Sequence, residues 1–219
     1  MYEYFTHSFD GMRKLVDILN SGGLDETFTD QECYTGGIPN GIYCHYIWDG
    51  LPIVYRDMQW AYNPIIFVMD TSIAKRNEMY ICDSVSYGDC VEHPESRIRH
   101  SKGNLKRKPN LNPLKKKILE DLHKNVEQKK LKRTNKNPMV YLFSHEVIFK
   151  GKIPLTFVKA ILIPKDEYKS LGNIPRLEEY LKQRSIQLIP YAPYTKNFHK
   201  YYERIDQNTQ RNEHSVDAT

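Results

Sequence analysis

The sequence predicts an α+β fold, in which a sheet carries helices on its surface, and three observations support this. Two strand-like stretches, Val140–Phe149 and Phe157–Ile163, are joined by a short turn rich in Lys, Gly and Pro. Apolar residues at helical spacing over residues 12–19 predict a helix near the start of the chain. Residues Ile65–Met69 have the apolar composition of a buried strand.

The chain begins with a strand followed by a helix. Tyr2–Thr6 alternates between polar and apolar residues as a strand does. Asp10 is a good N-cap for the helix that follows, and the run Ser21-Gly22-Gly23 is expected to end that helix. A loop rich in Gly then leads into a second strand at Ile42–Trp48.

The remaining elements are shorter. They are a strand at Met79–Cys82, a helix at Leu114–Leu131, a helix at Arg176–Arg184 and a strand at Ser185–Pro190. Residues 92–138 contain too few apolar residues for a separate core, so we interpret them as an insertion. We therefore expect one domain over residues 1–205, with a basic insertion at 92–138 and a polar, disordered tail at 206–219.

Composition excludes several classes of protein. The chain has 219 residues with 40% apolar content, and no apolar run approaches the length of a membrane span. The first residues do not have the pattern of a signal peptide. Its four cysteines form no CxxC pair, which favours reduced thiols and no metal site. We expect a cytoplasmic protein that does not bind membranes.

Positive charge is concentrated in one block. Between Arg97 and Lys136 there are 15 Lys and Arg against 3 Asp and Glu, which gives this block a net charge of +12. The whole chain has a net charge of +5, so the residues outside the block sum to −7. Such a block can be a solvated surface, but its size favours a polyanion, above all a nucleic acid. The candidate nucleic-acid-binding residues are Lys106, Arg107, Lys108, Lys115, Lys116 and Lys117.

Glu146 is a carboxylate in the middle of an otherwise apolar strand. Burial of an unpaired carboxylate costs several kcal/mol or shifts its pKa. The structural interpretation is that Glu146 pairs with a Lys or Arg, or lies on an edge strand. The functional interpretation is that it is a catalytic or ligand-binding group.

Two stretches of the chain carry a resemblance to a known family. The first, which is Tyr4-Phe5-Thr6-His7, a helix containing Leu15, Ile18 and Leu19, then Gly22-Gly23-Leu24, resembles the opening of ADP-ribosyltransferase-fold proteins. The second, His145-Glu146-Val147-Ile148-Phe149 with Gly151, Pro154-Leu155 and Phe157-Val158, is similar to the DarT-like branch.

The resemblance implies a single domain with a mostly antiparallel split sheet, and NAD as the substrate. It makes Glu146 the catalytic carboxylate and Arg56 a catalytic residue near NAD. The family's first-strand His corresponds either to Tyr4 or, in a shifted register, to His7. The implied NAD-binding residues are Tyr4, Thr6, His7, Tyr43, His45 and Tyr46.

The leading hypothesis is therefore an NAD-dependent ADP-ribosyltransferase that needs no metal. The basic block precedes the Glu146 strand, where the resembling fold contacts its acceptor, which suits DNA or RNA; a protein acceptor is the other option. The alternative is a non-enzymatic or degenerate protein that binds nucleic acid through residues 97–136. A nuclease ranks last, because Glu146 and Lys150 do not have the E-x-K spacing of common metal nucleases.

Overall fold

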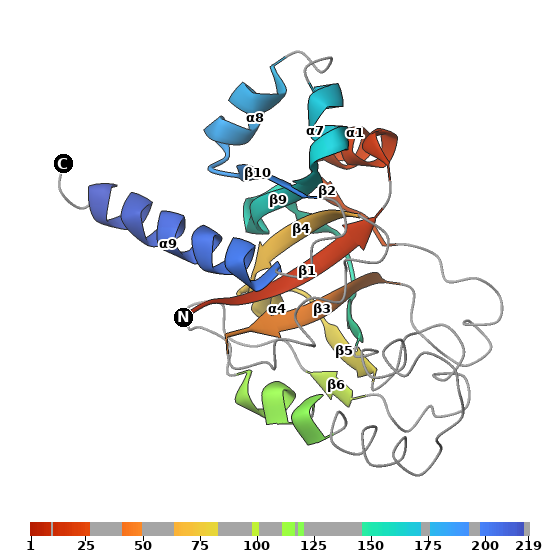
Figure 1. The fold of residues 1–219 in the computed structure, drawn as a ribbon. Helices are drawn as coiled ribbons and strands as arrows, with labels where there is room; N and C mark the ends of the chain where they lie inside the picture. Colours follow the sequence, from red (N-terminus) through yellow and green to blue (C-terminus); the bar gives the residue numbers. More distant parts are fainter. Residues whose placement is uncertain are drawn as a thin grey trace, which may run out of the picture. The chain divides into compact units, whose positions relative to one another are not determined.

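The computed structural model has a mixed α+β fold with mostly antiparallel strands and flanking helices, which confirms the predicted α+β class (Figure 1). It describes residues 1–9, 11–26, 41–49, 64–82, 98–100, 111–116, 118–120, 146–171, 176–192 and 198–216. The chain divides into two compact units, and the single domain over residues 1–205 stays a prediction. The first comprises residues 1–24, 47–70 and 154–219, and the second comprises residues 25–46 and 71–153.

Four strands of the first unit lie in the order β10-β9-β4-β1 (Figure 1). They are β1 (Glu3–Phe9), β4 (Ile65–Asp70), β9 (Val158–Pro164) and β10 (Gln187–Tyr191). Strand β4 is antiparallel to both β1 and β9, whereas β9 and β10 are parallel. A parallel pair needs a long connection. Helices α7 (Lys165–Ser170) and α8 (Leu177–Gln183) provide it.

The core of the first unit is apolar on both central strands. Residues Ile66 to Met69 of β4 and Ala160 to Ile163 of β9 are fully buried. Continuous apolar runs of this kind are typical of strands that are covered on both faces. The prediction of a buried strand at Ile65–Met69 is confirmed.

Helix α1 (Met12–Ser21) buries Leu15, Ile18 and Leu19, as its spacing predicts. Its N-cap is Gly11, which makes no side-chain hydrogen bond, and Asp10, the predicted cap, lies outside the described residues. Gly22 ends the helix in the left-handed conformation, with φ of 77°, and its N–H contacts the carbonyls of Ile18 and Leu19. Gly adopts this conformation without the steric cost of a Cβ.

Two short elements complete the first unit before its last helix. Strand β2 covers Gly23–Leu24 and a 3-10 turn covers Leu155–Phe157. The backbone N–H of Leu155 donates to the carbonyl of Gly22 at 3.1 Å. This bond joins the C-terminal end of helix α1 to the 3-10 turn that precedes β9.

The C-terminal segment differs from the prediction. Helix α9 runs from Phe198 to Val216, where the sequence predicts a disordered tail from residue 206. Its first turns bury Phe198, Tyr202 and Ile205 in the first unit. Once the first turns are packed, the helix extends readily, because each further helical residue adds one backbone hydrogen bond. No Gly or Pro interrupts residues 198–216.

In the second unit the strand order is β3-β7-β5-β6, and these neighbours are antiparallel. The strands are β3 (Ile42–Trp48, whose last two residues belong to the first unit), β5 (Met79–Cys82), β6 (Ile98–His100) and β7 (Glu146–Phe149). Helix α4 (Ile73–Arg76) precedes β5, and β8 (Ile153–Pro154) follows β7. Strand β6 lies inside the predicted insertion, so the insertion supplies part of the sheet as well as helical residues 112–116 and 118–120.

Candidate functional site around Glu146

Strand β7, which begins at Glu146, is an interior strand. It pairs with β3 on one side and with β5 on the other. The interpretation of Glu146 as an edge-strand residue is therefore wrong.

The strand registers place specific positions beside Glu146. Cys82 of β5 is its partner in the ladder. On the other side, Tyr43 of β3 pairs with Ile148 and Cys44 pairs with Val147. Directly paired residues of antiparallel strands lie on the same face of a sheet. Positions 146 and 82 thus share one face, and position 43 lies on that face too, because it pairs with Ile148, two residues after Glu146.

The predicted NAD-binding residues of β3 lie on both faces of that strand. Tyr43 and His45 share the face of Glu146, and both side chains are half-buried. Tyr46 lies on the opposite face and is buried, as is Cys44. The register therefore brings two of the three predicted residues to the face of Glu146 and excludes the third from that face.

The first-strand candidates lie on β1 in the first unit. Tyr4, Thr6 and His7 are all buried, with exposures of 6%, 0% and 8%. Strand alternation puts Tyr4 and Thr6 on one face and His7 on the other. Ring contacts agree with this, because Tyr4 stacks on Tyr2 while His7 contacts Phe9 at 5.9 Å between ring centroids. That these residues share a cleft with Glu146 stays a prediction.

The turn after β7 is held by side chains from distant parts of the second unit. The amide Nδ2 of Asn77 lies 2.7 Å from the carbonyl of Lys150, 3.1 Å from that of Gly151 and 3.4 Å from that of Lys152. Asn77 is itself buried. The backbone N–H of Lys150 donates to the carbonyl of Glu78 at 2.8 Å.

Two acidic residues also contact this turn. Glu26 accepts a hydrogen bond from the backbone N–H of Gly151, and its Oε2 lies 3.1 Å from Nζ of Lys150. Asp25 lies 3.3 Å from Nζ of Lys152. We call Asn77 and Glu26, with the turn residues they contact, the turn clamp. The turn clamp was not predicted from the sequence. The only signal for it was that the acidic pair Asp25 and Glu26 is opposite in charge to Lys150 and Lys152.

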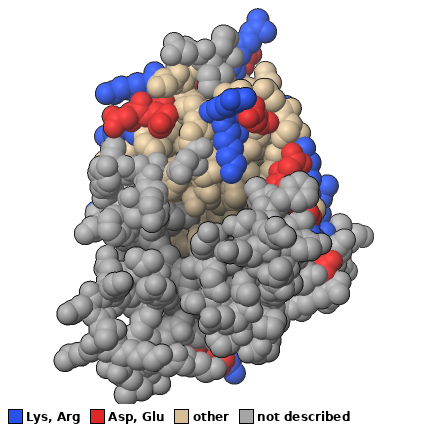
Figure 2. Space-filling view, turned by 90° about the vertical axis from the view of Figure 1, so that its right-hand side faces the viewer, with Lys and Arg blue, Asp and Glu red and all other residues tan. Residues whose placement is uncertain are grey.

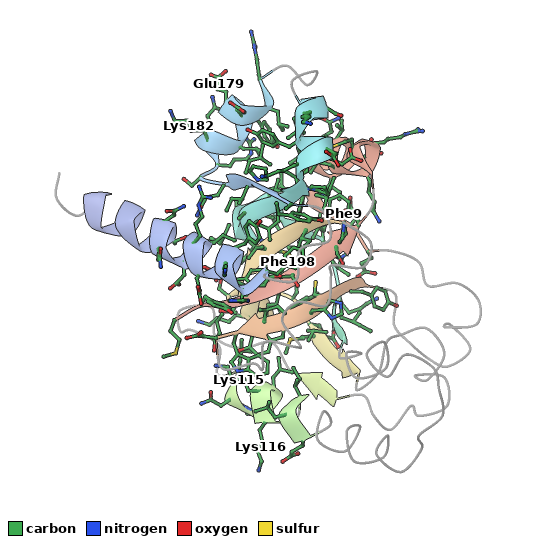
Figure 3. The ribbon with its side chains drawn as sticks, in the orientation of Figure 1. Phe9, Lys115, Lys116, Glu179, Lys182 and Phe198 are labelled. Carbon is green, nitrogen blue, oxygen red and sulfur yellow. The ribbon has the colours of Figure 1, made fainter. Side chains whose placement is uncertain are left out.

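The basic residues are described only in part. Lys115 is half-buried, while Lys116 is 80% exposed and lies 3.8 Å from Glu120 one helical turn on (Figure 3). Leu114 and Ile118 of the same helical segment are buried, as their spacing predicts. Elsewhere Lys and Arg side chains lie beside Asp and Glu on the face drawn in Figure 2. Outside the described residues lie Arg56, Lys106, Arg107, Lys108 and Lys117.

Comparisons with known proteins add no relative: no family model matches the chain, and the search of curated proteins found no match. Across the ranges that the structure describes, no group of three His, Cys, Asp or Glu is placed to hold a metal ion. None of the described helices combines the length and the apolar character that crossing a membrane requires.

Proposed function

We propose that this protein is an NAD-dependent ADP-ribosyltransferase that modifies a nucleic acid. The observation that supports it best is that Tyr43 and His45 of β3 lie on the same sheet face as Glu146 of the neighbouring interior strand β7. Apolar strands do not keep such a group without a partner or a use. The resemblance of the Glu146 segment to the DarT-like branch gives that use a specific chemistry.

The reaction transfers ADP-ribose from NAD to a nucleophile. The bond between the nicotinamide nitrogen and the ribose carbon breaks, and its electron pair leaves with nicotinamide, whose ring becomes neutral. Positive charge then develops on the ribose, and the Glu146 carboxylate stabilises it electrostatically. A nitrogen or oxygen of the acceptor bonds to the same carbon, and its proton passes to Glu146 as general base.

Neighbouring side chains have supporting roles in this proposal. The ring of Tyr43 provides an apolar surface for nicotinamide, and His45 offers a donor or acceptor for a ribose hydroxyl. Lys116, an exposed residue of the basic block, contacts the phosphates of the acceptor in this proposal. A protein with an acidic surface is the competing acceptor.

The test uses NAD with single-stranded DNA, RNA or protein acceptors. Glu146→Gln keeps the shape of the side chain but removes the charge, so transfer should fall by about 10²–10³ while the protein stays folded. Glu179→Gln, the same change on the exposed face of α8, is the matched control and should transfer like the wild type (Figure 3). Equal transfer by both variants removes Glu146 from the mechanism.

The acceptor is tested separately. Neutralising Lys115, Lys116 and Lys117 together should flatten the salt dependence of nucleic-acid binding, by about 0.7–0.9 log units per log unit of salt for each phosphate that the protein no longer neutralises. Hydrolysis of NAD without acceptor should stay intact. If the wild type and the triple variant bind DNA and RNA alike, a protein acceptor becomes the better proposal.

A further inference from the structure

The turn clamp concentrates more interactions than a surface turn needs. Three consecutive carbonyls, those of Lys150, Gly151 and Lys152, converge on one buried amide group of Asn77. In addition, Glu26 accepts a hydrogen bond from the backbone N–H of Gly151. Gly151 has φ of 79°, a conformation that residues with a Cβ rarely adopt. The turn is therefore fixed in an uncommon backbone shape.

The clamp also reaches the strand that carries Glu146. Lys150 directly follows β7, and its N–H donates to Glu78, the residue before β5. Asn77 is the C-cap of α4, where its own N–H donates to the carbonyl of Ile73 at 2.9 Å. The backbone of Asn77 is thus held by the end of α4, while its side-chain amide contacts the turn at the end of β7. The turn is therefore continuous with the paired end of β7 and β5.

We propose that the turn clamp fixes the register of β7 and that Asn77 is thereby a positioning residue for Glu146. This inference rests on the proposed function. Catalytic groups lose activity steeply when misplaced, by about 100-fold for a shift of about 1 Å. The chemistry of the clamp is specific, because carbonyl oxygens need a donor. Within the described residues, Oδ1 of Asn77 accepts no hydrogen bond, so its donating amide is the functional end.

Two substitutions separate the donor from the size of the side chain. Asn77→Ala removes the donor, whereas Asn77→Asp keeps the size and turns an acceptor toward three carbonyls, so Asn77→Asp should have the larger effect. The matched control makes the same two changes at Asn208, whose amide also donates one hydrogen bond, to Gln187 at 2.9 Å. Glu26→Gln is a milder clamp variant that keeps an acceptor for Gly151 and provides a readout if the Asn77 variants do not fold.

The experiment measures amide hydrogen exchange of residues 147–151 in the full chain, and steady-state kinetics with NAD. The clamp variants should exchange faster there by about 10-fold or more, because local opening of this unit becomes easier. In Asn77→Ala, kcat should fall by about 10–100-fold with KM for NAD changed little. The Asn208 variants should match the wild type in both measurements.

The outcomes can be told apart. Wild-type exchange at residues 147–151 in both Asn77→Ala and Glu26→Gln overturns the clamp, whatever the activity. Faster exchange with unchanged kcat overturns the positioning of Glu146. If Glu146→Gln transfers like the wild type, the proposed function fails and the positioning role fails with it, while the exchange data still decide whether the clamp fixes β7.

Discussion

Strand β4 of the first unit and strand β7 of the second are held in place by different means. Both lie between two neighbouring strands. Residues Ile66 to Met69 of β4 are fully buried among apolar side chains. Strand β7 has buried Val147, Ile148 and Phe149, but its end is fixed by the polar contacts of Asn77 and Glu26. Apolar packing resists salt and depends on volume, whereas polar contacts depend on single atoms.

The largest effect should come from a cavity beside β4. Leu162 of β9 is fully buried and pairs with Ile66. Leu162→Ala should lower the free energy of unfolding by about 2–5 kcal/mol, measured by urea denaturation, because the surroundings refill the space only in part. Lys169→Ala on the exposed face of α7 is the control and should change little. A loss below about 1 kcal/mol in Leu162→Ala would contradict close packing there.

The second variant tests whether β7 is packed as tightly as β4. A Cβ added at Gly41 would lie 2.5 Å from Cγ2 of Ile148 and 2.7 Å from the carbonyl oxygen of Phe149. Gly41→Ala should therefore destabilise the fold by about 1–3 kcal/mol, because β3 must move away from β7. Thermal unfolding measures it. Gly22→Ala meets no atom within 4 Å but keeps φ of 77°, so it should cost only about 1 kcal/mol.

The third variant tests the polar side of the comparison. Asn77→Ala leaves the carbonyls around it without their donor, so the free energy of unfolding should fall by about 1–3 kcal/mol. Tyr191→Phe provides a reference in the first unit, since its hydroxyl donates to the carbonyl of Pro64 at 2.5 Å. If Asn77→Ala costs less than Tyr191→Phe in urea denaturation, the three contacts of Asn77 do not act together.

The smallest effect belongs to the exposed ion pair. Lys152 and Asp25 are 43% and 62% exposed, so water and salt screen their attraction. Lys152→Ala should cost about 0.2–1 kcal/mol at low salt and nothing measurable at about 1 M salt. Denaturation at both salt concentrations checks this. A loss that persists at high salt would show that Lys152 acts through something other than charge.

Part of this fold could be predicted from local pattern. The bounds of β3 at Ile42–Trp48 and of β5 at Met79–Cys82 match the predictions, because alternation and β-branched or aromatic residues mark strands directly. Helix α9 was missed although Phe198, Tyr202 and Ile205 recur at helical spacing, because the polar residues after them favoured a tail. The packing of these three buried side chains stabilises the start of the helix.

For the candidate site, the sequence could predict single residues but not which of them lie side by side. Glu146 stands out locally, since a carboxylate in an apolar strand is unusual. Its neighbours depend on register, which pairs positions far apart along the chain, and no local pattern encodes that for Tyr43 or Cys82. Asn77 was missed for the same reason, because its partners at the Lys150 turn are 73 to 75 residues away.

The strand order of the first unit has a consequence for synthesis on the ribosome. Strand β4 pairs with β1, which precedes it, and with β9, which begins 93 residues after the start of β4 (158 − 65). At about 5–20 residues per second, the apolar segment Ile65–Met69 waits about 5–20 s with one edge uncovered. An uncovered apolar edge is a template for pairing with other chains. Nascent chains halted before Val158 should therefore bind holdase chaperones, and chains extended past Tyr191 should release them.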